Sequence, residues 1–159
     1  MDPIFIHPFT MQICGPTMSG KILFVKKLFK KIKQMCSVTF DGILFFYGEW
    51  QIAYEKDIST LLDTKIEFYE GVPNPEYHSH DNSKKKLTCI DDLYKEAGDS
   101  VLNLFTKGCR IITSHHKNIS VIFITQNLFY KGNFSRDISL NTNYLIIFKI
   151  LEIDHSYNS

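Results

Sequence analysis

The feature that most constrains the fold of this chain is a series of short, nearly uninterrupted apolar runs, each followed by a polar or helical stretch. Strands that are buried on both faces of a parallel sheet are apolar along their whole length, instead of alternating with polar residues. The five runs that we interpret as strands are Phe9–Cys14, Gly42–Tyr47, Leu87–Ile90, Ile119–Thr125 and Tyr144–Lys149, and Ile66–Tyr69 is a shorter candidate. The sequence therefore predicts a doubly wound α/β fold.

Two segments between these runs have the spacing of amphipathic helices. In Lys21–Cys36, apolar residues recur every three or four positions and five lysines fall between them, which predicts a helix with a charged outer face. Asp99–Lys107 predicts a second helix, with Asp99 or Ser100 near its N-cap. Gly71–Lys86 contains two prolines, two histidines and three lysines, and predicts an exposed loop.

Composition limits the class of protein. The chain has 159 residues, 44% of them hydrophobic and 14% aromatic, which favours one folded domain over disorder. No apolar run is as long as a membrane span and the N-terminus has no signal-like pattern, so we expect a soluble intracellular protein of the nucleus or cytoplasm. The four cysteines have no paired spacing and are expected to be free thiols. The net charge of +1 does not by itself require a nucleic-acid partner.

A phosphate-binding pattern joins the first strand to the first helix. Residues 15–21 satisfy G-x-x-x-x-G-K, in which glycines turn backbone N–H groups toward phosphates and the lysine reaches the β- and γ-phosphates. The pattern predicts an ATP site formed by Gly15, Pro16, Thr17, Met18, Ser19, Gly20, Lys21 and Ile22.

The last residue of this site departs from the usual pattern. Working loops have Ser or Thr at this position, and its hydroxyl ligates Mg²⁺, a cation that requires oxygen ligands. Ile22 offers no oxygen, so we expect phosphate binding to survive and metal-assisted hydrolysis to be weakened. The alternative is that Ile22 only packs the start of the helix.

Polar residues follow two of the predicted strands, where ligands bind in open α/β sheets. Asp91 and Asp92 end the third strand and are candidates for holding Mg²⁺ and orienting the attacking water, respectively, or for simply capping a helix. Gln126 follows the fourth strand and either senses the γ-phosphate or caps the strand. Arg136 is a candidate arginine finger acting across a subunit boundary, with a surface ion pair as the alternative.

The combination of these motifs resembles the viral-type DNA-packaging ATPases of the FtsK/HerA P-loop superfamily, in particular the copies carried by Maverick/Polinton-like elements. The resemblance covers about residues 5–149 and rests on the following stretches: GPTMSGK, YGEWQ, LTCIDDL, LFTKG, SHHKNISVIFITQNLF, SRDISLN and YLIIFK. It implies a RecA-like (ASCE) sheet in which the five strands, numbered along the chain, have the order 5-1-4-3-2. It also implies ATP and Mg²⁺ as cofactors, a homo-oligomeric ring and double-stranded DNA as a partner.

Within the family pattern, Lys21 would bind phosphate, Asp91 the metal and Asp92 the water, with Gln126 as sensor and Arg136 as the finger in trans. Three features depart from that pattern: Ile22, an inserted CRIIT at 109–113, and a divergent tail at 150–159 where the family continues. We therefore expect residues 1–149 to form a P-loop ATPase-like domain of a degenerate, C-terminally truncated copy. Assembly into a ring is then doubtful.

Other residues are weaker candidates. Glu49 is a reserve catalytic acid, Trp50 is expected to pack with Tyr47 and Tyr54, and residues 84–86 either touch DNA or solvate a loop. The histidine pairs at 78–80 and 115–116 are minor metal or phosphate candidates. Two other functions compete with an ATPase: a catalytically inactive nucleotide- or partner-binding remnant, and a small P-loop kinase, which two arginines disfavour.

Overall fold

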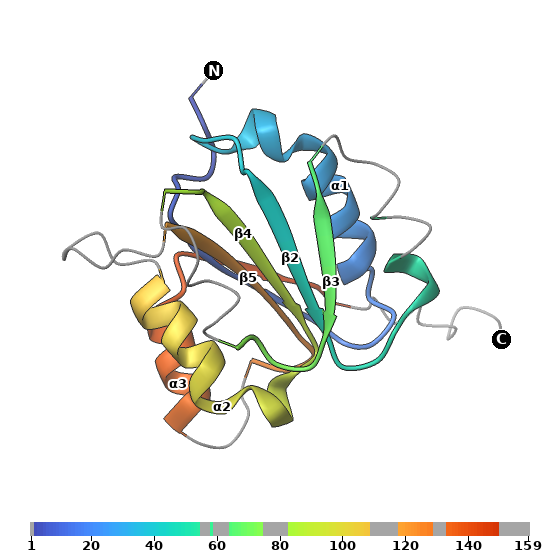
Figure 1. The fold of residues 1–159 in the computed structure, drawn as a ribbon. Coiled ribbons are helices and arrows are strands. Elements are labelled where there is room, and N and C mark those ends of the chain that lie inside the picture. Colours follow the sequence, from blue (N-terminus) through green and yellow to red (C-terminus); the bar gives the residue numbers. More distant parts are fainter. Residues whose placement is uncertain are drawn as a thin grey trace, which may run out of the picture.

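Six parallel strands form one sheet at the centre of the molecule (Figure 1). In this computed structural model, the described residues are 2–54, 58, 64–74, 83–108, 118–128 and 133–149, and only the backbone is described for 94–97, 107–108 and 133. The strands are β1 (Thr10–Cys14), β2 (Gly42–Tyr47), β3 (Ile66–Glu70), β4 (Lys86–Asp91), β5 (Ile119–Thr125) and β6 (Tyr144–Ile147).

The strand order is β3-β2-β4-β5-β1-β6, and every neighbouring pair is parallel. The five strands predicted first have the predicted relative order, with β5 between β1 and β4. The shorter candidate is also a strand and adds β3 at the β2 edge. In the predicted loop 71–86, residues 75–82 lie outside the described part, and Lys86 belongs instead to β4, where it pairs with Gly42.

Helices cover both faces of the sheet (Figure 1). The helix α1 (Lys21–Met35) packs on one face, whereas α2 (Tyr94–Asn103) and α3 (Asn133–Leu140) pack on the other. The backbone leaves the helical region at Gly98, so the predicted start at Asp99 coincides with the second segment of α2. The sequence missed the first segment of α2 and all of α3, whereas the predicted helix 99–107 continues in the structure as the π-helix η3 (Leu104–Gly108).

Two apolar clusters explain why the strands read as continuous apolar runs. On the α1 side, Ile13, Phe45 and Ile122 pack against the helix, and on the α2–α3 side Phe46 and Phe123 do the same. All seven residues of β5 are buried, since this strand lies inside the sheet and both of its faces are covered. The three cysteines in the described residues, Cys14, Cys36 and Cys89, are buried free thiols, and Cys109 lies outside that part.

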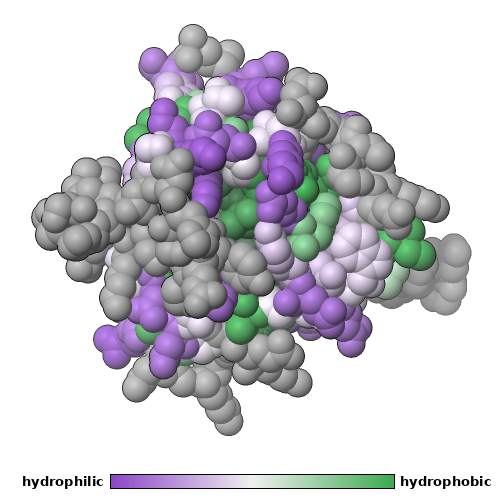
Figure 2. Space-filling model, in the orientation of Figure 1, coloured by the Kyte–Doolittle hydropathy of each residue, from purple (hydrophilic) through white to green (hydrophobic). Residues whose placement is uncertain are grey.

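The two ends of the strands differ in character. All six strands end at the edge where the loop between β1 and α1 lies, and they begin at the opposite edge. Lys84 and Lys85 are exposed at that opposite edge, just before β4 begins. Figure 2 shows hydrophilic residues near its upper margin, where β2 and β4 begin, and also at its lower left and lower right. Within the described part of the chain, no helix is long and apolar enough to span a membrane.

Candidate functional site

The loop that joins β1 to α1 has a backbone that requires its two glycines. Gly20 precedes the first turn of α1 with φ of 95°, in the left-handed region that favours glycine. At Gly15 the reason is close packing, because an added Cβ would lie 2.6 Å from the Phe148 Cβ and 2.9 Å from the Ser19 Oγ. The loop therefore passes directly against the segment that follows β6.

The Lys21 side chain bends back over this loop. Its Nζ donates hydrogen bonds to the carbonyl oxygens of Gly15, at 2.5 Å, and of Pro16, at 2.8 Å. Partial burial lowers the pKa of Lys21, and the nearby carboxylates of Asp91 and Asp92 oppose that shift. The ammonium group is thus held at the mouth of the loop by groups that a bound anion could replace.

Asp91 is the last residue of β4 and is 4% exposed. The Tyr54 hydroxyl donates a hydrogen bond to its Oδ2. Burial is the largest effect on this carboxyl and raises the pKa of Asp91 to about 6, while the Tyr54 hydrogen bond and the charge of Lys21 act in the opposite direction. The side chain is therefore a desolvated carboxylate at neutral pH, which favours a compact cation as its partner.

Asp92 follows in a bend with φ of 51°, and its side chain is exposed. Gln126, the residue after β5, donates a hydrogen bond from its Nε2 to the Asp92 Oδ2 over 2.8 Å. Because β4 and β5 are adjacent parallel strands, their carboxyl ends place these two side chains together. The alternative in which Gln126 only caps its own strand does not describe this contact.

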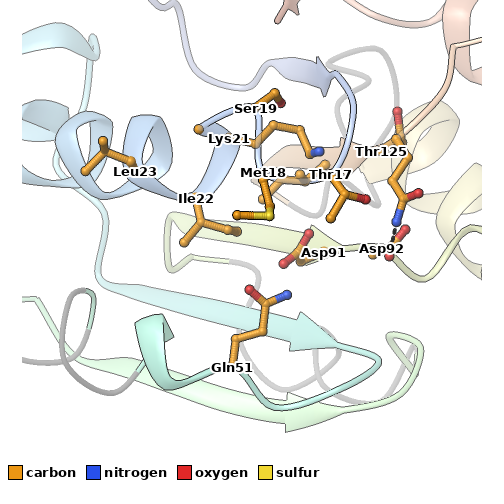
Figure 3. Close-up of a pocket in the computed structure, with 13 residues that line it drawn as sticks. Thr17, Met18, Ser19, Lys21, Ile22, Leu23, Gln51, Asp91, Asp92 and Thr125 are labelled. Carbon is orange, nitrogen blue, oxygen red and sulfur yellow. Dashed lines mark hydrogen bonds between the residues drawn. The ribbon is translucent and has the colours of Figure 1, made fainter. Parts of the chain in front are cut away.

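The predicted metal and water residues and most of the predicted phosphate loop line one cavity of about 420 Å³ at the carboxyl ends of the strands (Figure 3), whereas Gly15 and Pro16 of that loop are not in the lining. Its lining contains Lys21, Ile22, Asp91, Asp92 and Gln126. The loop residues Thr17, Met18, Ser19 and Gly20 complete it on the α1 side.

Sequence reasoning missed three polar residues of this site, besides the apolar lining residues Leu23 and Ile124. Gln51 and Thr125 line the cavity, and Tyr54 contacts Asp91 from behind it. Gln51 and Tyr54 follow β2, which lies beside β4. The predicted strand order was therefore the one signal in the sequence that could have placed this segment at the site. A single tyrosine in a helical turn has no motif of its own.

Ile22 lines the same cavity and is only partly buried, with its side chain packed against the core on the α1 side. The two interpretations of Ile22, that it packs the start of the helix and that it deprives Mg²⁺ of an oxygen ligand, are therefore compatible. No oxygen of this residue reaches the cavity, and the remaining oxygen donors of the lining are carboxylates, amides and hydroxyls.

Two hydroxyl groups in the cavity lining indicate whether this cavity fits a polar ligand. Ser19 Oγ and Thr125 Oγ1 are buried and have no hydrogen-bond partner among the described residues. Unpaired buried hydroxyls are uncommon in folded proteins and indicate an unfilled polar role. Together with one ammonium and two carboxylates, they fit a phosphate group accompanied by Mg²⁺, which takes one or two protein carboxylates beside phosphate oxygens. No cluster of three metal-ligating side chains occurs in the described ranges.

Arg136 lies on α3, is exposed, and is not part of the cavity lining. Glu49 is exposed and also lies outside the lining, whereas Trp50 contacts the rings of Tyr47 and Tyr54 as predicted. The inserted segment 109–113, both histidine pairs and the tail 150–159 lie outside the described residues.

Comparison with known proteins supports the fold. No protein-family model and no curated protein matches the sequence. Among solved structures, the crystal structure of Cdc6p from Pyrobaculum aerophilum is similar, with a TM-score of 0.55 and 16% sequence identity over 91% of this chain. The chain spans 40% of the length of that protein. The likeness, the parallel sheet and the loop between β1 and α1 together assign the chain to the P-loop NTPase fold.

Proposed function

We propose that this chain is an ATP-binding P-loop domain related to the DNA-packaging and translocating ATPases of large DNA viruses and virus-like transposons, with hydrolysis weakened by Ile22. The observation that carries the proposal is the presence of Lys21, Asp91, Asp92 and Gln126 in one cavity at the carboxyl edge of the sheet. The shared motifs, in particular SHHKNISVIFITQNLF, support the relation to packaging ATPases.

Phosphate binding would use the loop 15–21 and the N-terminus of α1. Backbone N–H groups there are not all used within the helix, and the helix dipole adds positive potential. Phosphate oxygens would replace the carbonyls of Gly15 and Pro16 as acceptors for the Lys21 ammonium. This exchange converts a contact within the loop into the main charge contact with the ligand.

Asp91 would hold Mg²⁺, through water or directly, since its carboxylate is buried in the cavity wall. The bound ion would neutralise charge on the β- and γ-phosphates. Asp92 would orient the attacking water, and Gln126 would fix the Asp92 carboxylate through the 2.8 Å hydrogen bond. Ile22 removes one ligand from this arrangement and leaves the phosphate contacts in place.

A second candidate is a nucleotide-binding protein without hydrolysis. The partly buried side chain of Ile22 favours it, because the residue is integrated into the core and its position supplies no metal ligand. The two candidates share the binding step and differ only in turnover.

The test is an ATP titration with and without Mg²⁺, measured by calorimetry and by the fluorescence of Trp50, the only tryptophan of the chain. Lys21→Ala should weaken binding at least tenfold, because it deletes the phosphate-facing charge. Lys30→Ala removes the same charge from the exposed face of α1 and should bind ATP like the parent. Equal affinity of the Lys21→Ala variant and the parent would exclude the loop as a nucleotide site.

The ring and the role of Arg136 form a separate part of the proposal. If Arg136 acts on the site of a neighbouring subunit, Arg136→Ala and Lys21→Ala proteins should each be inactive alone and regain DNA-stimulated hydrolysis when they are mixed. Mixed proteins that stay at background, while the parent is active, would remove Arg136 from the mechanism.

A further inference from the structure

Tyr54 connects a buried aromatic cluster to the carboxylate that is the candidate metal ligand. Its side chain is 1% exposed, and its hydroxyl donates to the Asp91 Oδ2. Asp91 itself is 4% exposed, so both partners are withdrawn from water. Hydrogen bonds to a charged group in such surroundings are stronger than those at the surface.

The tyrosine ring is held in place from several sides. Its centroid lies 4.9 Å from that of Phe45, 5.8 Å from Tyr47, 5.6 Å from Trp50 and 6.2 Å from Phe68. The backbone is fixed as well, because the Tyr54 N–H donates to the carbonyl oxygen of Gln51 over 2.9 Å. The hydroxyl is thus a rigid donor at the back of the cavity, supported by β2 and β3.

This contact distinguishes the two oxygens of Asp91. Oδ2 is occupied by the hydroxyl, so Oδ1 is the oxygen left for a ligand. Rotation about the Cβ–Cγ bond would break the hydrogen bond, which restrains the carboxylate plane. The same bond acts against the larger effect of burial, which raises the pKa of Asp91.

We propose that Tyr54 is a positioning residue of the metal site, whose hydroxyl fixes one oxygen of Asp91 so that the other meets Mg²⁺ or its bound water. The inference rests on the proposed nucleotide site and adds a residue to it. Gln51, one turn before Tyr54, lines the same cavity, so this segment forms its third wall beside the phosphate loop and the end of β4 (Figure 3).

The test compares the affinity for Mn²⁺, as a paramagnetic substitute for Mg²⁺, with the affinity for ATP in the absence of metal. Electron paramagnetic resonance counts free Mn²⁺ in the presence of saturating ATP. Tyr54→Phe keeps the ring and should weaken Mn²⁺ binding at least fivefold, while metal-free ATP affinity stays within twofold of the parent. Tyr47→Phe, in the same aromatic cluster, is the matched control and should change neither affinity.

Thermal melting checks that each variant is folded. Tyr54→Leu also removes the hydroxyl and should weaken Mn²⁺ binding at least fivefold, which gives a second variant if the first does not fold. Unchanged Mn²⁺ affinity in Tyr54→Phe, with affinity lost in Asp91→Ala, would overturn the role of Tyr54 and leave the nucleotide site intact. Failure of the parent to bind ATP would overturn both proposals.

Discussion

Gln126 donates a hydrogen bond from its side-chain amide to the Asp92 carboxylate over 2.8 Å, which joins the ends of two neighbouring strands. Asp92 is exposed and lies in a left-handed bend, so its own backbone leaves the side chain free to rotate. The amide fixes that rotation. If the proposed site is correct, Gln126 positions the Asp92 carboxylate through this hydrogen bond.

Removing the Gln126 amide should lower the rate of ATP hydrolysis more than the affinity for ATP. Gln126→Ala in an Ile22→Thr background should hydrolyse ATP at least tenfold more slowly, because the carboxylate is no longer held toward the attacking water. The affinity for ATP should stay within about threefold. Asn127→Ala changes the adjacent residue, which lies outside the cavity lining, and should leave both quantities unchanged. A parallel loss in both variants would point to a disturbed loop.

Restoring an oxygen at position 22 should increase hydrolysis. Threonine is β-branched like isoleucine and offers a hydroxyl to Mg²⁺ beside Asp91. Ile22→Thr should raise turnover by at least tenfold, about 1.4 kcal/mol of barrier, and make it steeply dependent on Mg²⁺. ATP affinity without metal should stay constant. Turnover that remains at background would favour the inactive binding protein.

Some residues of the site could be predicted because they belong to a local sequence pattern, whereas others could not. The loop 15–21 and the acids after β4 belong to local patterns, and strand order then brings Gln126 to the same edge. Tyr54 could not be found in this way, since its contact with Asp91 depends on how a helical turn after β2 is packed by aromatic rings.

The fold could be predicted where burial leaves a local sequence pattern, and the prediction failed where it leaves none. Burial on both faces marks each inner strand in the sequence, and that is why β5 was predicted to the residue. The helix α3 has only Phe134 and Ile138 packed against the core, too few for a visible helical period. Gly98 interrupts α2, and the only start signal considered for the segment before it was the alternative in which Asp91 or Asp92 caps a helix.

Neutralising Asp91 should stabilise the protein near neutral pH. Its pKa is raised from 3.8 to about 6, so the folded chain holds this proton more tightly than the unfolded chain does. The charged carboxylate therefore opposes folding above about pH 6, and the penalty fades as pH falls through that value toward 4. Asp91→Asn should raise the free energy of unfolding by about 1–3 kcal/mol at pH 7.5 and have little effect near pH 4.

Denaturant unfolding at the two pH values measures this difference. Asp92→Asn, an exposed neighbour with the same chemical change, should show no such gain. A destabilised Asp91→Asn variant at pH 7.5 would mean that the Tyr54 hydrogen bond and the charge of Lys21 outweigh the burial of the charge.

The two loop glycines should respond differently to alanine. At Gly15 an added methyl group would overlap the Phe148 Cβ and carbonyl oxygen, and we expect a loss of about 1–3 kcal/mol of stability together with weaker ATP binding. At Gly20 the space is open and only the backbone is strained, by about 1 kcal/mol. Gly71→Ala has a similar φ of 88° away from the site and measures that strain alone. Equal losses at positions 15 and 71 would contradict the packing argument.

The close approach of Gly15 to Phe148 has a consequence for how the site is assembled. The Phe148 N–H donates a hydrogen bond to the Cys14 carbonyl oxygen over 2.7 Å. This bond joins the residue after β6 to the end of β1, more than 130 positions earlier in the sequence. Such distant pairings close the longest loops of a chain and form late. The phosphate loop should therefore acquire its shape only after β6 has docked, and a nascent chain would complete its nucleotide site at the very end of its folding.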